Sequence, residues 1–181
     1  MYPCMTKKTL SIISVITLLF IVTGTAYWSS SSVANKVNQY IHTADLSLYT
    51  HRGVVSTVME EDTEIPINAK IAIVDQKLSE GNTLLALAKY DELLQQDPSN
   101  MELLLRMGII YLQKNEYSLA QENLSEVYGF KASIFSLDAA WFLALLNAEY
   151  EQWDKVKELL KEVVEGRGNY HKQAKDLLDS L

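Results

Sequence analysis

The longest apolar stretch of the chain lies close to its N-terminus. Residues Thr9 to Trp28 include no charged side chain and are rich in Leu, Ile, Val and Phe. At a helical rise of about 1.5 Å per residue, a stretch of this length reaches about 30 Å, the thickness of the hydrocarbon core of a bilayer. The pattern therefore predicts a transmembrane helix at residues 9–28, with a short tail at residues 1–8.

Charges beside this stretch predict its orientation. Lys7 and Lys8 precede it, and the next basic residue is Lys36. By the positive-inside tendency, the tail stays cytoplasmic and the rest of the chain is extracytoplasmic, which means periplasmic in a bacterium. A cleaved signal peptide is the main alternative, because Ser32-Val33-Ala34 loosely resembles a cleavage site. The stretch exceeds the usual signal-peptide core of about 7 to 15 residues, which favours a retained signal-anchor over cleavage or a buried core helix.

Residues 29–66 are predicted to form a tether between the membrane helix and a folded domain. The stretch begins with four serines and ends at Ile65-Pro66. Within it, Val37, Ile41, Ala44 and Leu48 recur at spacings of three and four, which indicates a short helix. The acidic run at residues 60–64 holds no glycine for a calcium-binding turn, so it is interpreted as a solvated loop.

From Ile67 onward the apolar positions follow a helical period, and the pattern repeats. Ala86, Ala120 and Val156 begin equivalent stretches, so the first two are 34 residues apart and the last two 36. An all-α domain at residues 67–181, built from about three helical hairpins, follows from this periodicity.

The middle unit carries the fullest motif. It reads Leu104-x-x-Met107-Gly108-x-x-Tyr111, followed by Tyr117-x-x-Ala120-x-x-x-Leu124. This resembles the tetratricopeptide repeat, whose signature is W-x2-L-G-x2-Y, then A-x3-F, then P. The first unit departs from it at Val74 and Lys77, and the third at Asn147 and Val156. The resemblance, to the membrane-anchored tetratricopeptide proteins of bacterial envelopes, implies an α-solenoid with repeats at 67–100, 101–136 and 137–170 and a capping helix at 170–181.

The resemblance also implies a concave groove lined by the first helix of each repeat. Aligned on the motif, the groove positions are Ile71, Asp75, Leu78, Leu105, Arg106, Ile109, Leu112, Gln113, Trp141, Leu145 and Glu149. Ile71 and Asp75 stand where some family members carry the Lys and Asn that bind a peptide carboxylate. The groove is therefore expected to bind an apolar or amphipathic segment of a partner. Alternatively, these residues pack against the chain's own residues 33–60 or against a second copy of the chain. A homo-oligomer is therefore one of the alternatives.

Residues for catalysis or for cofactor and metal binding are not apparent. The three histidines lie nine or more residues apart, and the chain has neither a phosphate-binding glycine loop nor a GxSxG motif. Cys4 is the only cysteine, which rules out a CxxC pair. These features predict a protein that is not an enzyme and needs no cofactor.

Charge narrows the class of partner. After residue 28 the chain carries 14 basic and 23 acidic residues, a net charge of −9. An acidic body argues against nucleic-acid binding, which requires a basic surface. The sequence therefore predicts a membrane-tethered protein–protein interaction module. Its alternative is a structural subunit or assembly factor of a membrane complex, with the groove permanently occupied.

Overall fold

The computed structural model describes residues 32–49 and 65–181. The predicted membrane helix at 9–28, the tail before it and the acidic run at 60–64 lie outside these residues. In the part of the chain that is described, no helix is long and apolar enough to cross a bilayer.

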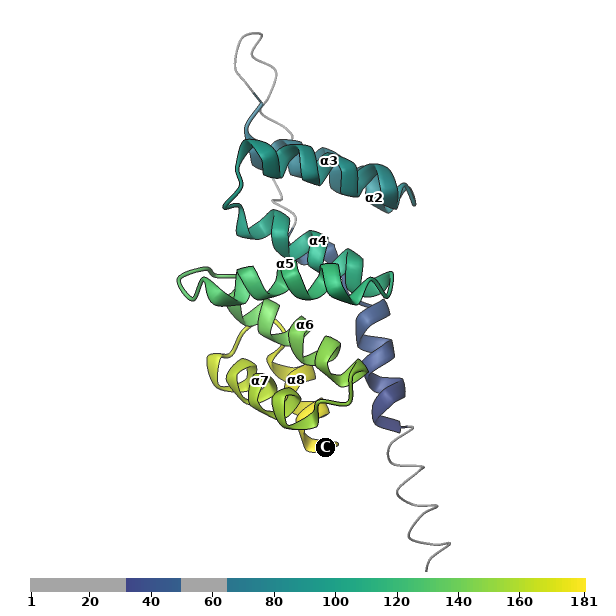
Figure 1. Ribbon diagram of the computed structural model, residues 1–181, viewed down its shortest axis with the longest axis vertical. Coiled ribbons are helices and arrows are strands. Elements are labelled where there is room, and N and C mark those ends of the chain that lie inside the picture. Colours follow the sequence, from purple (N-terminus) through teal and green to yellow (C-terminus); the bar gives the residue numbers. More distant parts are fainter. Residues whose placement is uncertain (1–31, 50–64) are drawn as a thin grey trace, which may run out of the picture.

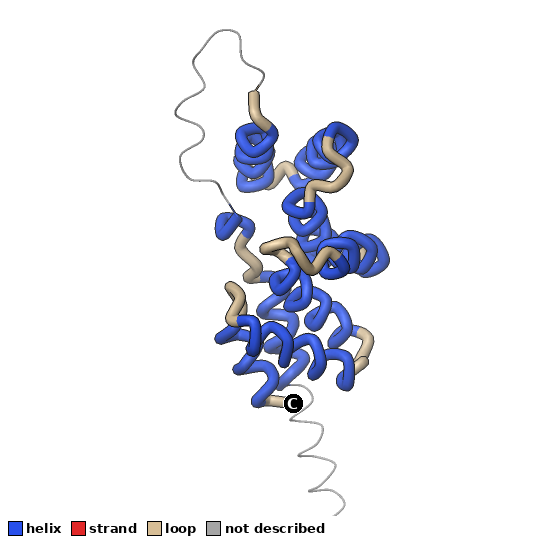
Figure 2. The backbone as a smooth tube through the Cα atoms, turned by 90° about the vertical axis from the view of Figure 1, so that its left-hand side faces the viewer, coloured by secondary structure: helices blue, strands red, loops and turns tan. Residues whose placement is uncertain are grey.

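The described residues form helices and connecting loops, without strands (Figure 2). After a helix at residues 32–42 come a short 3-10 helix and seven α-helices: η1 (Leu46–Tyr49), α2 (Ile67–Ser79), α3 (Thr83–Gln96), α4 (Met101–Gln113), α5 (Tyr117–Gly129), α6 (Ser136–Glu149), α7 (Trp153–Gly166) and α8 (His171–Asp179). Successive hairpins stack along the long axis, as Figure 1 shows. The all-α class is confirmed for these residues, and the arrangement is consistent with an α-solenoid.

Each hairpin turns at a residue in the left-handed backbone region. Gly81 has φ +85°, Asn115 +60° and Glu151 +56°. These positions are 34 and 36 residues apart, so the turn repeats with the same period as the helices. Gly and Asn adopt this conformation readily, but Glu does not. The third turn is therefore imposed by packing of the helices on either side of it.

Close approach of helices α4 and α5 depends on Gly108. A Cβ atom added there would lie 2.7 Å from Cγ of Leu124, a fully buried side chain. Small residues recur at the other crossings, where Ala86 and Ala144 are fully buried. The motif glycine is thus required by packing, since its helix is regular at this point.

Replacing Gly108 by Ala should lower the free energy of unfolding by about 1 kcal/mol. Overpacking in a tight core costs about 1–3 kcal/mol, and the better helix propensity of Ala offsets about 1 kcal/mol. Gly129→Ala is the matched control, because a Cβ there meets nothing within 4 Å. Urea titration of both variants measures the difference, and Gly129→Ala should be neutral or slightly stabilising. Equal losses for both variants would contradict the packing role of Gly108.

Candidate partner-binding groove

Much of the predicted groove is filled by the chain itself. The N-terminal segment, residues 32–49, runs along the first helices of the second and third hairpins (Figure 1). Its buried Val33, Val37 and Ile41 are four residues apart, so they lie on one face of the helix. They belong to the same apolar core as the groove positions Leu105, Ile109, Leu112, Trp141 and Leu145. Residues 32–49, which belong to the stretch predicted as a tether, are therefore part of the folded domain.

Polar contacts to α8 and to α4 hold the helix of this segment in place. In its first half, the Lys36 ammonium lies 2.9 Å from the Asp176 carboxylate of α8, and one turn later the Tyr40 hydroxyl donates to that carboxylate at 2.8 Å. At the end, Nε2 of Gln113 donates to the carbonyl oxygens of Ile41 and Ala44, each at 3.2 Å. Gln113 thereby joins the chain at the C-terminus of this helix to α4.

Tyr49 anchors the far end of the segment in a buried site. Its ring packs edge-on against Phe135, with centroids 5.9 Å apart, and its hydroxyl oxygen lies 3.4 Å from that of Tyr170. The hydroxyl also hydrogen-bonds to Asp138, whose carboxylate accepts from Nδ2 of Asn169 at 2.8 Å. Burial raises the pKa of Tyr49 far above its ordinary value. Tyr49 therefore stays neutral, and its role is to hold the end of the segment against the domain.

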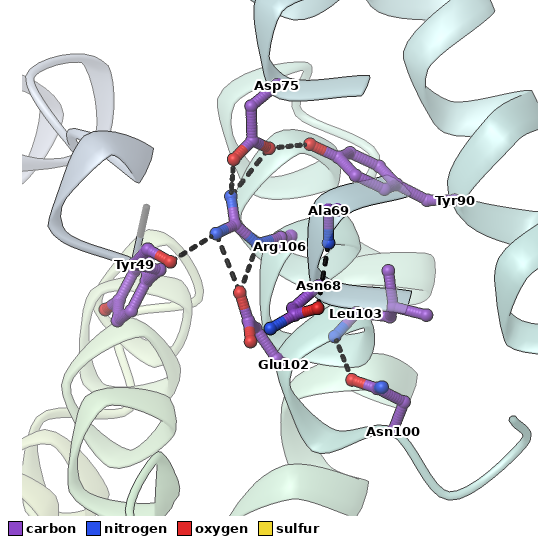
Figure 3. Close-up of polar contacts among 9 residues, drawn as sticks. All are labelled: Tyr49, Asn68, Ala69, Asp75, Tyr90, Asn100, Glu102, Leu103 and Arg106. Atoms are coloured by element: carbon purple, nitrogen blue, oxygen red, sulfur yellow. Dashed lines mark hydrogen bonds and ion pairs between the residues drawn. The ribbon is translucent and has the colours of Figure 1, made fainter. Parts of the chain in front are cut away.

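A buried guanidinium joins the segment to the first two hairpins (Figure 3). Arg106, fully buried on α4, donates to both Asp75 carboxylate oxygens at 2.7 and 2.8 Å and to Glu102 at 2.8 and 3.1 Å. It also donates to the Tyr49 carbonyl at 2.8 Å, and Asp75 accepts from the Tyr90 hydroxyl. Burial raises the pKa of Asp75, and the Arg106 guanidinium opposes that rise. The cluster thus joins four elements, η1, α2, α3 and α4.

Part of the groove stays open beside the first hairpin. A cavity of about 680 Å³ lies between α2, the end of α4 and residues 44–46. Its lining consists of Ala44, Asp45, Leu46, Ala72, Asp75, Gln76, Leu78, Ser79, Thr83, Ile110, Gln113 and Lys114. Three predicted groove positions, Asp75, Leu78 and Gln113, are among them.

The remaining predicted positions are distributed over the fold. Ile71 is buried in the core of the first hairpin, which also contains Val74, Tyr90 and Leu103. Glu149 is exposed and accepts a hydrogen bond from the Tyr117 hydroxyl at 3.1 Å. Sequence reasoning did not single out Tyr49 and Asp138, because neither belongs to the repeat motif. The one available signal was that Tyr49 follows Leu48 at the end of the predicted short helix.

Asp138 should make the stability of the protein depend on pH. Its pKa is raised, chiefly because burial disfavours the charged carboxylate. An unfolded Asp titrates near pH 3.9, so the folded state binds more protons just above that value. The stability that Asp138 contributes is therefore complete below pH ~3.9 and is lost as the pH rises through the folded pKa. As the pH rises through this window, the free energy of unfolding of Asp138→Asn should increase relative to that of wild type. A difference that is independent of pH would contradict the raised pKa of Asp138.

Comparison with known protein families gives a match over part of the chain. Residues 77–127 match the tetratricopeptide repeat family. The matched stretch begins near the end of α2 and covers α3, α4 and most of α5. Neither the curated proteins nor the solved structures include a match to the chain. Among the described residues, no group of acidic, His or Cys side chains could hold a metal ion.

Proposed function

We propose that this protein is a membrane-tethered protein–protein interaction module whose concave groove is partly filled by its own N-terminal segment. The tetratricopeptide match supports a role in protein binding. The observation that carries the finer proposal is the open cavity on the concave face, next to a groove that the segment occupies. A partner inserts an apolar or amphipathic segment there, and the protein performs no catalysis.

The N-terminal segment gives the solenoid a polarity relative to the proposed membrane helix. Only three residues separate Trp28 from residue 32, so these two Cα atoms are at most about 15 Å apart. Lys36 contacts α8, whereas residues 44–46 line the cavity beside the first hairpin. The segment therefore runs from the capping end towards the first hairpin (Figure 1). In the proposed arrangement α8 lies near the membrane, and the cavity faces a partner farther from it.

Tethering raises the chance of binding without any additional contact. A module held at the membrane meets a partner in the same membrane at a high effective concentration. The segment adds rigidity, because its apolar face and the Tyr49 anchor hold the solenoid to the chain that leads into the membrane.

Photo-crosslinking in the native membrane tests this function. A benzophenone amino acid at Gln76, which lines the cavity, should give a discrete adduct with one partner protein. The same group at Gln95, an exposed residue of α3 outside the cavity, is the matched control. The adduct should disappear when Ala72→Trp fills the cavity. No adduct at Gln76, or the same adducts at both positions, would overturn the proposal.

The second candidate is a structural subunit or assembly factor in which the groove is permanently occupied. The packing of Val37 and Ile41 against Trp141 and its neighbours favours it, because that part of the groove has no free surface. Under this function, the Gln76 crosslinker gives no adduct, and the whole complex is recovered through other surfaces.

The extracytoplasmic location of the solenoid is also a proposal, supported by the lysines before the apolar stretch. A cysteine introduced at Gln95 should react with a membrane-impermeant maleimide on intact cells. Cys4 is an internal control, because it belongs to the tail proposed to be cytoplasmic and should react only after lysis. The reverse pattern would reverse the orientation.

A further inference from the structure

The first hairpin, α2 and α3, has an apolar core that is separate from that of the other hairpins. Together with one face of α4, this core consists of Ile71, Val74, Ala86, Leu87, Tyr90, Leu93, Leu103, Met107 and Ile110. Another face of α4, which includes Leu105 and Ile109, belongs to the larger core of the second and third hairpins. In a stacked repeat protein each unit contacts only its neighbours, so a unit at the end of the stack is held through one interface. The first hairpin is therefore expected to open more easily than the other two.

The N-terminal segment adds contacts that a linear stack of hairpins lacks. Lys36 binds α8, and Val37 and Ile41 pack in the larger core with side chains of α4 and α6. Farther along the segment, Leu46 is partly buried and packs against both apolar cores. The segment thus connects the first hairpin to elements of the third hairpin and to the capping helix.

A buried hydrogen-bond junction reinforces this connection. The Arg106 guanidinium donates both to Asp75 of α2 and to the Tyr49 carbonyl of the segment, at 2.7 and 2.8 Å (Figure 3). Hydrogen bonds of a charged donor are stronger than neutral ones, and this donor is fully buried. The Tyr49 side chain in turn contacts Phe135 and Tyr170. The position of α2 therefore depends on a carbonyl group that residues preceding α6 and α8 hold in place.

The open cavity lies between the parts that this junction connects. Residues 44–46 form one wall, α2 forms another through Ala72, Gln76 and Leu78, and the end of α4 forms a third. With a volume of about 680 Å³, the cavity gives α2 space to move relative to the segment. Its shape thus depends on the angle between the first hairpin and the segment.

We propose that residues 44–49 act as a latch that fixes the angle of the first hairpin, so that the cavity keeps its shape only while the segment is docked. Undocking withdraws Leu46 and the Tyr49 carbonyl from the first hairpin, which then moves about its interface with α4. The coupling is reciprocal, because a molecule that fits the cavity of the docked state also stabilises docking. The latch belongs to this chain alone and holds independently of the proposed function, in which it makes partner binding depend on the docked segment.

Hydrogen exchange on the full chain in nanodiscs tests the latch through a remote substitution. Val37→Asp changes a side chain of the larger core and should undock the segment. Exchange in α2 and α3 should then accelerate by about tenfold, equivalent to ~1.4 kcal/mol, and by more than exchange in α5 and α7. Asn38→Asp, at the neighbouring exposed position, is the matched control and should exchange like wild type.

A second variant acts on the latch itself. Leu46→Ser removes the apolar contact with the first hairpin, and it should accelerate exchange in α2 and α3 while residues 33–41 stay protected. Wild-type exchange of α2 and α3 in Leu46→Ser, or in Val37→Asp when residues 33–49 exchange fast, would overturn the inference. Equal acceleration of all helices would also overturn it, because the first hairpin would then have no motion of its own.

Spin labels measure the angle of the first hairpin directly. In a Cys4→Ser background, cysteines at Gln95 of α3 and Lys161 of α7, both exposed, should give a narrow distance distribution that broadens in Val37→Asp. The control pair, Gln121 of α5 with Lys161, joins the second and third hairpins and should stay narrow in both proteins. None of these measurements involves a partner, so the native-membrane experiment at Gln76 judges the proposed function separately. An unchanged distribution for the Gln95 pair after undocking would overturn the latch.

Discussion

Arg106→Leu should lower the free energy of unfolding by about 3–5 kcal/mol, the largest single effect expected in this protein. The substitution removes the fully buried cation and, with it, the ion pairs that this cation makes with Asp75 and Glu102. It also removes a donor from the Tyr49 carbonyl, so the N-terminal segment loosens. Urea titration of the full chain in detergent micelles measures the loss.

A surface pair provides the control for Arg106. Lys131 lies 2.8 Å from Glu162, and about half of its side chain is exposed. Lys131→Leu should cost less than about 1 kcal/mol, because solvent screens exposed pairs. Adding Asp75→Asn and Glu102→Gln to Arg106→Leu should recover part of the loss by removing the buried charges. Similar losses for Arg106→Leu and Lys131→Leu would show that the buried cluster contributes no more to the free energy of unfolding than an exposed ion pair does.

Val37→Asp should detach the N-terminal segment from the groove. Val37 is 1% exposed and packs in the core that contains Leu105 and Trp141. Burying an unpaired carboxylate there is so costly that undocking is favoured, and the docked state should lose at least about 3 kcal/mol. Hydrogen exchange should accelerate in residues 33–49 and in the faces of α4 and α6 that the segment covers.

Asn38→Asp introduces the same carboxylate at the neighbouring, exposed position. It should leave exchange and stability within about 0.5 kcal/mol of wild type, as surface substitutions usually do. Fast exchange confined to the segment, with α4 and α6 still protected, would contradict the conclusion that the segment completes the core.

The buried groove positions also change how partner binding must be tested. Charged substitutions at Leu105 or Ile109 would disturb the packing of the N-terminal segment, because both side chains are buried in the shared core. If such a variant no longer bound a partner, the loss would have two explanations, unfolding of the domain and removal of the contact. Substitutions in the open cavity, such as Ala72→Trp, avoid this ambiguity.

Sequence alone determined the repeat and its helical hairpins. Apolar residues at a helical period, with Ala or Gly recurring every 34 to 36 residues, predict stacked helix pairs because small residues allow close crossings. The structure agrees at Gly108, where Leu124 leaves no room for a side chain. Local chemistry was sufficient here, since each hairpin is formed by residues close together in the chain.

Only the tertiary structure decided what lies in the groove. The apolar stripe of Val37 and Ile41 shows that one helical face is buried, but periodicity carries no information about the surface that buries it. Lys36 and Asp176 are 140 residues apart, and Tyr49 and Tyr170 are 121 apart. Contacts over such separations depend on the stacking of all three hairpins, which brings α8 and α4 to the same concave face. For this reason the repeat could be predicted from sequence, whereas its filled groove and open cavity could not.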